Sequence, residues 1–111
     1  MNKLVMITAL LFMSSSVFAA TTTQYSNTHF DVGAYNSKVA AYQAGFQHIE
    51  KINDMSQAML KFELPVFGIH SGSHVVIDGT SVKLEEFEKT QGNVAYRSII
   101  NVDYHYKVRR H

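Results

Sequence analysis

Residues 94–108 alternate between two kinds of side chain over a longer run than any other part of the sequence. Valine, tyrosine and isoleucine dominate one parity, whereas the other parity is mostly polar. A period of two is typical of a strand. Because one face is apolar and the other polar, we expect this strand to belong to an antiparallel sheet that is covered on one side. Its length predicts a bend or bulge.

A second apolar pattern, with helical spacing, predicts a helix over residues 37–54. Its stripe consists of Val39, Tyr42, Phe46, Ile49 and Ile52. Asn36 or Ser37 can cap the helix, because a side-chain oxygen there accepts a hydrogen bond from a free amide of the first turn. Gly45 costs about 1 kcal/mol relative to alanine inside a helix. This cost predicts that the helix approaches the sheet closely at Gly45.

The remaining segments predict shorter strands and turns. Residues 25–32, 60–64 and 75–77 have strand patterns, and Asp78-Gly79 is typical of a hairpin turn. Residues 81–88 fit a strand or a short helix, and we favour the strand. Residues 91–93 form another turn signal, and residues 70–74 a loop.

The order of these elements predicts an α+β fold, with one helix packed on a curved antiparallel sheet of four to five strands. The chain runs strand, helix, then a meander of strands. We expect Phe46, Ile49, Ile100 and Val102 in the core. If Phe46 is fully buried, its replacement by alanine should cost roughly 3–5 kcal/mol.

Residues 1–19 have the three parts of a secretory signal peptide. Lys3 supplies a positive start, and residues 4–13 are almost wholly apolar. Val17 and Ala19 occupy the −3 and −1 positions of a predicted cleavage site that follows Ala19. The apolar run is shorter than the ~20 residues that a spanning helix needs, and we see no second run. We therefore expect a bacterial protein of the periplasm, or a secreted one, with a single small domain at residues 20–111 and no integral membrane segment.

The charge balance and the cysteine content limit the classes of partner and site that this chain can have. Once Lys3 is removed, the ten basic and nine acidic residues of the chain become evenly balanced. We therefore expect no nucleic-acid partner. The chain has no cysteine, which excludes disulfides, thiolate metal sites and a lipid-modified N-terminal cysteine. No cofactor is predicted.

Histidines supply the one metal-site hypothesis. His70 and His74 flank a Ser-Gly-Ser loop, and imidazole is the commonest metal ligand. A closed zinc site needs four ligands and a catalytic one three. His105, Asp78 and His29 are the nearest candidates for the others, although the sequence does not place them. Two solvated loop histidines are the alternative interpretation.

Besides a binding protein and a metal-binding protein, we consider a third function, a small hydrolase. The sequence contains no Gly-rich phosphate loop, no Gly-x-Ser-x-Gly turn and no His-Glu-x-x-His motif. Glu85, Glu86 and Glu88 lie close in sequence, but neighbouring residues of a strand point to opposite faces. We therefore expect no catalytic residues.

The polar face of strand 94–108 is the candidate partner surface. We expect its far end, around residues 103–109, to outrun its neighbours and leave a bare edge for self-association or for another envelope protein. A strand at 25–32 covering this edge is the alternative. The candidate partner-binding residues are Arg97, Asp103, His105, Lys107 and Arg109.

Four segments carry a resemblance to a known family. They are Ala-Tyr-Gln-Ala-Gly-Phe at 41–46, Leu-Pro-Val-Phe at 64–67, residues 82–87, and Asn-Val-Asp-Tyr-His-Tyr at 101–106. The chain resembles short exported proteins of Gram-negative bacteria whose domain is of unknown function. It is also similar, in size and signal peptide, to small periplasmic stress proteins with a helix-on-sheet domain. The resemblance implies export and assigns no catalytic or binding residues, so we expect a non-catalytic binding or envelope-associated module.

Overall fold

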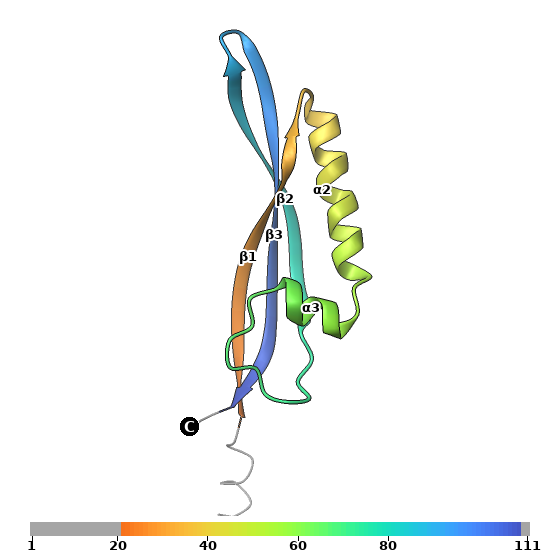
Figure 1. The fold of residues 1–111 in the computed structure, drawn as a ribbon, viewed down its shortest axis with the longest axis vertical. Coiled ribbons are helices and arrows are strands. Elements are labelled where there is room, and N and C mark those ends of the chain that lie inside the picture. The colour runs from red at the N-terminus through yellow and green to blue at the C-terminus, as the bar shows by residue number, and fades with distance from the viewer. Residues whose placement is uncertain (1–20, 110–111) are drawn as a thin grey trace, which may run out of the picture.

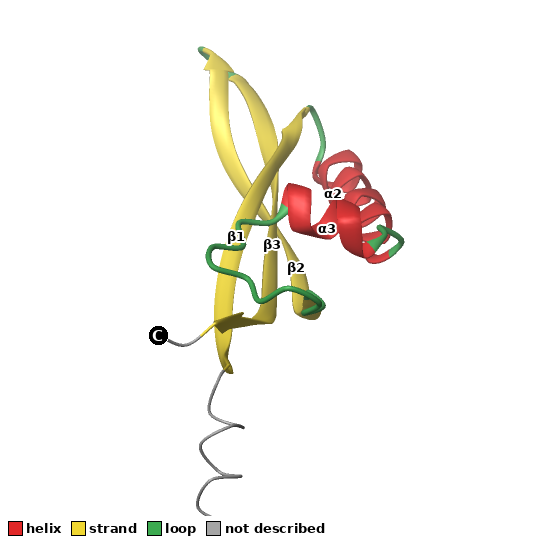
Figure 2. Cartoon of the chain, turned by 60° about the horizontal axis from the view of Figure 1, so that its bottom comes forward, coloured by secondary structure: helices red, strands yellow, loops and turns green. Residues whose placement is uncertain are grey.

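A computed structural model describes residues 21–109. In chain order the elements are β1 (Thr21–Tyr35), α2 (Lys38–Asn53), α3 (Gln57–Glu63), β2 (Val76–Thr90) and β3 (Asn93–Arg109). The strands form one antiparallel sheet in the order β1-β3-β2, and both helices lie on the same side of it (Figures 1 and 2). The α+β class is confirmed. The described part of the chain has three strands and two helices, rather than four to five strands and one helix.

The signal-peptide prediction concerns residues that lie outside the described range. Within residues 21–109, neither helix is both long enough and apolar enough to cross a membrane.

β3 is the central strand, and its alternation was predicted correctly. Ser98, Ile100, Val102 and Tyr104 are buried on the side that faces α2. β1 pairs with one edge of β3, from Thr21–Arg109 to Tyr35–Tyr96. β2 pairs with the other edge and joins β3 by a turn in which Gly92 has φ +83°, a backbone conformation that favours glycine.

β2 replaces several shorter predicted elements. The predicted strand over residues 75–77 and the hairpin at Asp78-Gly79 are wrong as separate features, because one strand runs from Val76 to Thr90. A bulge between Ile77 and Gly79 marks the predicted turn. The chain passes through this bulge without reversing, and Gly79 does not adopt a positive φ there. The strand interpretation of residues 81–88 is confirmed.

β1 is longer than the predicted strand over residues 25–32. Gly33 does not end it but lies at a bulge, with φ +144°, where the register with β3 shifts. The backbone amide of Gly33 donates to Asp31 Oδ1 at 3.1 Å. The strand then continues to Tyr35.

α2 begins after Ser37, whose hydroxyl accepts a hydrogen bond from the amide of Ala40 at 3.1 Å. The helix and its cap were predicted correctly, but its orientation was not. The buried residues of α2 are Ala41, Gly45, Ile49 and Ile52. The prediction that Phe46 is a core residue is wrong, because 56% of its surface is exposed. Ile49, Ile100 and Val102 are buried as expected.

The small residues explain this orientation. A Cβ atom on Gly45 would lie 2.6 Å from Val82 Cγ1 and 2.9 Å from Ser98 Oγ. The backbone of α2 therefore touches the sheet at Gly45, as the glycine predicted. That contact turns Phe46 toward solvent.

Residues 60–64 were predicted as a strand and belong instead to α3 and its end. The hydroxyl of Ser56 accepts from the amide of Met59 and caps this helix. Leu60 and Leu64 are both buried. Their spacing of four fits one face of a helix as well as it fits strand alternation. A short segment offers too few residues to separate the two periods.

Two tyrosines of β3 hold the loop that follows α3. Tyr104 donates a short hydrogen bond from its hydroxyl to the carbonyl of Pro65. The amide of Phe67 donates to the hydroxyl of Tyr106 at 3.1 Å. Burial raises the pKa of Tyr104 above its ordinary value of 10.0, and the neighbouring Tyr106 adds to the increase. This loop therefore packs on the same side of the sheet as the helices.

Candidate functional site

The candidate site is the side of the sheet that faces away from α2 and α3, which we call the open face. It is formed by every second side chain of each strand, as the pairing register gives them. Its principal polar members are Tyr25, Asn27, His29, Asp31, Asp78, Ser81, Lys83, Glu85, Arg97, Asn101, Asp103 and His105. The helices and the segment after α3 pack on the other side, so no element within residues 21–109 covers this face.

Cross-strand pairs organise the open face between β1 and β3. Asn27 donates a short hydrogen bond to Asp103 Oδ1. His29 Nδ1 donates to Asn101 Oδ1 at 2.7 Å. These pairs join residues that lie opposite each other in the register. They fix side chains that would otherwise be mobile at a solvent-exposed surface.

Arg97 links all three strands near the other end of this face. Its Nε atom lies 3.2 Å from Asp31 on β1, and its Nη1 atom lies 3.1 Å from Glu85 on β2. The guanidinium group also lies 4.8 Å from the ring centre of Phe87. These groups are well exposed, so each ion pair contributes little to stability. These contacts orient the Arg97 side chain. They do not by themselves indicate a ligand.

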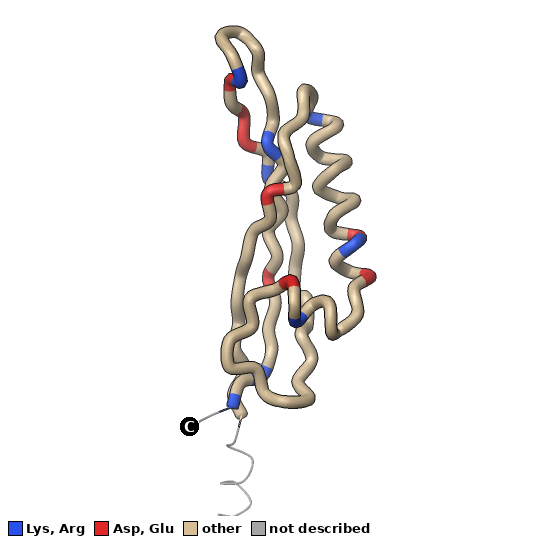
Figure 3. Tube along the Cα trace, in the orientation of Figure 1, with Lys and Arg blue, Asp and Glu red and all other residues tan. Residues whose placement is uncertain are grey.

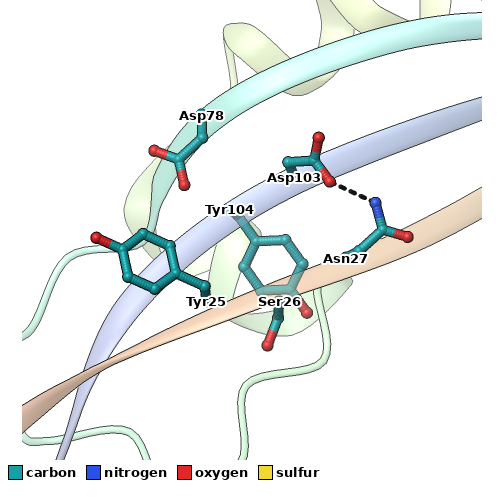
Figure 4. A pocket seen from close by; sticks show the side chains of 6 residues that line it. All are labelled: Tyr25, Ser26, Asn27, Asp78, Asp103 and Tyr104. Carbon is teal, nitrogen blue, oxygen red and sulfur yellow. Dashed lines mark hydrogen bonds between the residues drawn. The ribbon is translucent and has the colours of Figure 1, made fainter.

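A shallow hollow of about 550 Å³ lies between the strands at the end of the open face near Tyr25. Figure 4 shows Asn27 on β1, Asp103 on β3 and Asp78 on β2 around it, with the ring of Tyr25 beside them. Ser26 and Tyr104, which alternate with these residues and have the opposite parity on their strands, also border it. Two carboxylates and an exposed aromatic ring thus share one concave surface.

His105 forms a hydrogen-bonded pair with Asp78, one of the residues that line this hollow. His105 Nδ1 donates to Asp78 Oδ1 at 2.7 Å, and the ring of Tyr25 lies 5.3 Å from the imidazole. The bulge in β2 brings Asp78 into this position. Such a pair orients a histidine as a general base requires. Within residues 21–109, no serine or threonine hydroxyl hydrogen-bonds to His105.

The two histidines of the metal hypothesis lie in a loop, as predicted, but differ in surroundings. The amide of His70 donates to the carbonyl of Lys107 at 2.7 Å, and His70 Nδ1 is buried without a hydrogen-bond partner. His74 is exposed. No group of three or more histidine, aspartate or glutamate side chains that could hold a metal occurs between residues 21 and 109. The structure therefore supplies no third ligand from His105, Asp78 or His29.

The predicted bare edge at the end of strand 94–108 is wrong. β1 covers one side of it, pairing from Thr21 with Arg109 onward. On the other side the amide of Lys107 donates to Ser73 Oγ at 2.9 Å, and the amide of Arg109 donates to the carbonyl of Gly68 at 3.4 Å. Both the strand at residues 21–35 and the loop before β2 therefore cover this edge.

The predicted partner-binding side chains nevertheless share a face. Arg97, Asp103, His105, Lys107 and Arg109 have one parity on β3. Figure 3 shows basic and acidic residues interspersed along the elements instead of gathered on one side. Sequence reasoning missed Tyr25 and Asn27, and it named Asp78 only as a possible metal ligand. The alternating pattern of β1 was a usable signal for the first two, whereas Asp78-Gly79 was read as a turn.

Comparison with known proteins identifies the family. Residues 1–111 match the model of a domain of unknown function, DUF8398. The chain belongs to the DUF8398 family. This result confirms the expected membership of a family of unknown function. No curated protein matches the DUF8398 chain. No solved structure matches it either.

Proposed function

We propose that this DUF8398 protein is exported and that its mature domain is a non-catalytic binding module of the cell envelope, with the open face as its binding surface. The observation that carries the proposal is the hollow between Tyr25, Asp78 and Asp103 on a sheet face that no described element covers. The signal-peptide pattern of residues 1–19 supports the export step.

The chemistry of the hollow suggests what kind of partner it takes. Asp78 and Asp103 bring two carboxylates to its rim, each with one partner of its own in His105 and Asn27. Each carboxylate can accept further hydrogen bonds. Tyr25, with 71% of its surface exposed, offers a ring for stacking. We therefore expect a partner that presents hydrogen-bond donors or a cationic group beside a flat surface.

Two measurements test this proposal. Intact-mass analysis of the protein recovered from the envelope should give a chain that begins at Ala20, and a chain that retains Met1 would contradict export. Photo-crosslinking tests the surface in the same cells. A photoreactive phenylalanine analogue at Tyr25 should form adducts, whereas the analogue at Phe62, an exposed residue of α3, should not.

A third variant tests the chemistry of the hollow. Asp103→Ala should reduce the adducts formed from position 25, because it removes an acceptor from the rim. Equal adduct formation from positions 25 and 62, or no effect of Asp103→Ala, would contradict the proposed binding surface.

A further inference from the structure

The outer edge of β2 is unpaired in the described structure. β2 pairs with β3 along one side, and no backbone hydrogen bond from residues 21–109 reaches its other side. β1 has a similar outer edge. An exposed strand edge is a template for another strand. The two edges differ in which flank of α2 lies beside them.

An apolar flank of α2 lies above the edge of β2. Val39, Tyr42 and Phe46 are all exposed, and the rings of Tyr42 and Phe46 stack with their centres 6.4 Å apart. Tyr42 lines a small hollow with Leu84 and Glu86 of β2. The opposite flank of the helix instead brings His48 to within 5.9 Å of Phe30 on β1. The unpaired edge and the uncovered apolar flank therefore occur on the same side of the molecule.

We propose that two copies of this chain associate through antiparallel pairing of β2 with β2 of the second copy, which joins the two sheets into one of six strands. The two α2 helices then lie on the same face of the continuous sheet. Tyr42 and Phe46 of each copy face those of the other. This association covers the strand edge and the apolar flank together, and it does not rest on binding at the hollow beside Tyr25.

The charges of β2 select the register and favour a second copy as the occupant. With Leu84 on the two-fold axis, Lys83 of each copy lies opposite Glu85 of the other, and no like charges face each other along residues 78–90. Moving the axis by one residue places Lys83 against itself or Glu85 against itself. Opposite charges across strands stabilise a pair and like charges destabilise it. A two-fold axis is also the commonest symmetry of protein dimers.

A lipid surface fits the same region less well. Glu85, Glu86 and Glu88 follow one another along the edge strand. An anionic membrane surface would repel these carboxylates. The second copy, by contrast, uses Glu85 in a favourable pair.

Disulfide trapping tests the register directly, because the chain has no cysteine of its own. In Leu84→Cys the two introduced thiols meet at the axis, within the range that a disulfide can bridge. Thr90→Cys is the matched control on the same strand. Its two thiols would lie roughly 40 Å apart, at about 3.3 Å per residue along the strand.

The expected result is a covalent dimer of Leu84→Cys under mild oxidation and none of Thr90→Cys. A folded Leu84→Cys protein that remains monomeric, or equal crosslinking of both variants, would overturn the proposal. Circular dichroism establishes that each variant is folded.

A charge exchange gives a second test that needs no crosslink. Lys83→Glu should weaken the dimer of the protein expressed from the full chain by about fivefold or more, since two attractive pairs become repulsive. Adding Glu85→Lys in the same chain should restore association. Lys51→Glu, an exposed charge reversal on α2 away from this flank, should leave it unchanged.

Sedimentation velocity measures all four proteins. A monomeric wild-type protein at about 100 µM would refute the dimer. Equal weakening of the dimer by Lys83→Glu and Lys51→Glu would refute the register. Recovery of association in the double variant Lys83→Glu, Glu85→Lys shows that misfolding does not cause the weakening seen with Lys83→Glu alone.

Discussion

Ser98 Oγ donates a hydrogen bond of 2.7 Å to the carbonyl oxygen of Ala41, and both residues are fully buried. The bond joins the first half of β3 to the first half of α2. It lies beside Gly45, where the helix backbone touches the sheet. A serine on the apolar parity of β3 thus fixes the height and rotation of the helix. The exposed position of Phe46 follows from this contact.

Ser98→Ala should lower the free energy of unfolding by about 1 kcal/mol, because a buried hydrogen bond is lost without creating a large cavity. Ser81→Ala, at an exposed position of β2, is the matched control and should have almost no effect. Urea unfolding followed by circular dichroism measures both. Equal effects of the two substitutions would show that the bond to Ala41 contributes nothing specific.

Gly45→Ala should destabilise the protein although alanine is the better helix former. The gain in helix propensity is about 1 kcal/mol, but the new methyl group would lie 2.6 Å from Val82 Cγ1. Overpacking of this kind typically costs about 1–3 kcal/mol. We expect a net loss in thermal unfolding experiments.

The control for this prediction is Val82→Ala, which removes the atom that clashes. The double variant should be less destabilised than the sum of the single variants, because the smaller side chain makes room for the methyl group. Strict additivity would mean that the helix moves away from the sheet instead.

The orientation of α2 shows what the sequence could and could not predict. Spacing located the helix, its cap and the close approach at Gly45. It did not reveal which flank is buried, because Ile49 and Ile52 belong to both the apolar stripe and the small-residue face. The contact of Gly45 with Val82 and Ser98 decides between them, and that contact depends on residues far along the chain.

Phe46→Ala and Ile52→Ala test this orientation. Phe46 is 56% exposed and Ile52 is 2% exposed. We expect Ile52→Ala to cost about 2–5 kcal/mol, as for other buried isoleucines, and Phe46→Ala to cost less than about 1 kcal/mol in the monomer. Unfolding at low protein concentration keeps association from contributing. A larger loss for Phe46→Ala would show that the helix packs on its aromatic flank.

The candidate site illustrates a different limit of prediction. Alternation along residues 94–108 placed Arg97, Asp103 and His105 on one face correctly. Their partners depend on the register of β1 and β2, which the sequence does not specify over such a distance. Asp78 reaches His105 only because a bulge interrupts β2. The Asp-Gly pair that lies at the bulge is also a hairpin signal, so the local sequence is compatible with both outcomes.

Tyr104 should make the protein sensitive to alkali. Burial raises the pKa of its hydroxyl in the folded state above the ordinary value of 10.0, which the unfolded chain retains. The folded protein therefore holds this proton more tightly than the unfolded chain does. The resulting contribution to stability is fully present below about pH 10 and is lost as the pH rises from there through the folded-state pKa.

Tyr104→Phe removes this titration and the hydrogen bond to Pro65. At pH 7 the substitution should reduce the free energy of unfolding by about 1 kcal/mol. Between pH 9 and pH 11 (roughly the range around the ordinary tyrosine pKa) the variant should lose less stability than the unchanged protein.

Tyr25→Phe, at an exposed ring, is the control and should keep the wild-type dependence on pH. Chemical unfolding at a series of pH values gives these slopes. A Tyr104→Phe slope equal to that of Tyr25→Phe would mean that another group causes the alkaline loss, and that Tyr104 holds the loop at Pro65 without contributing to the pH dependence.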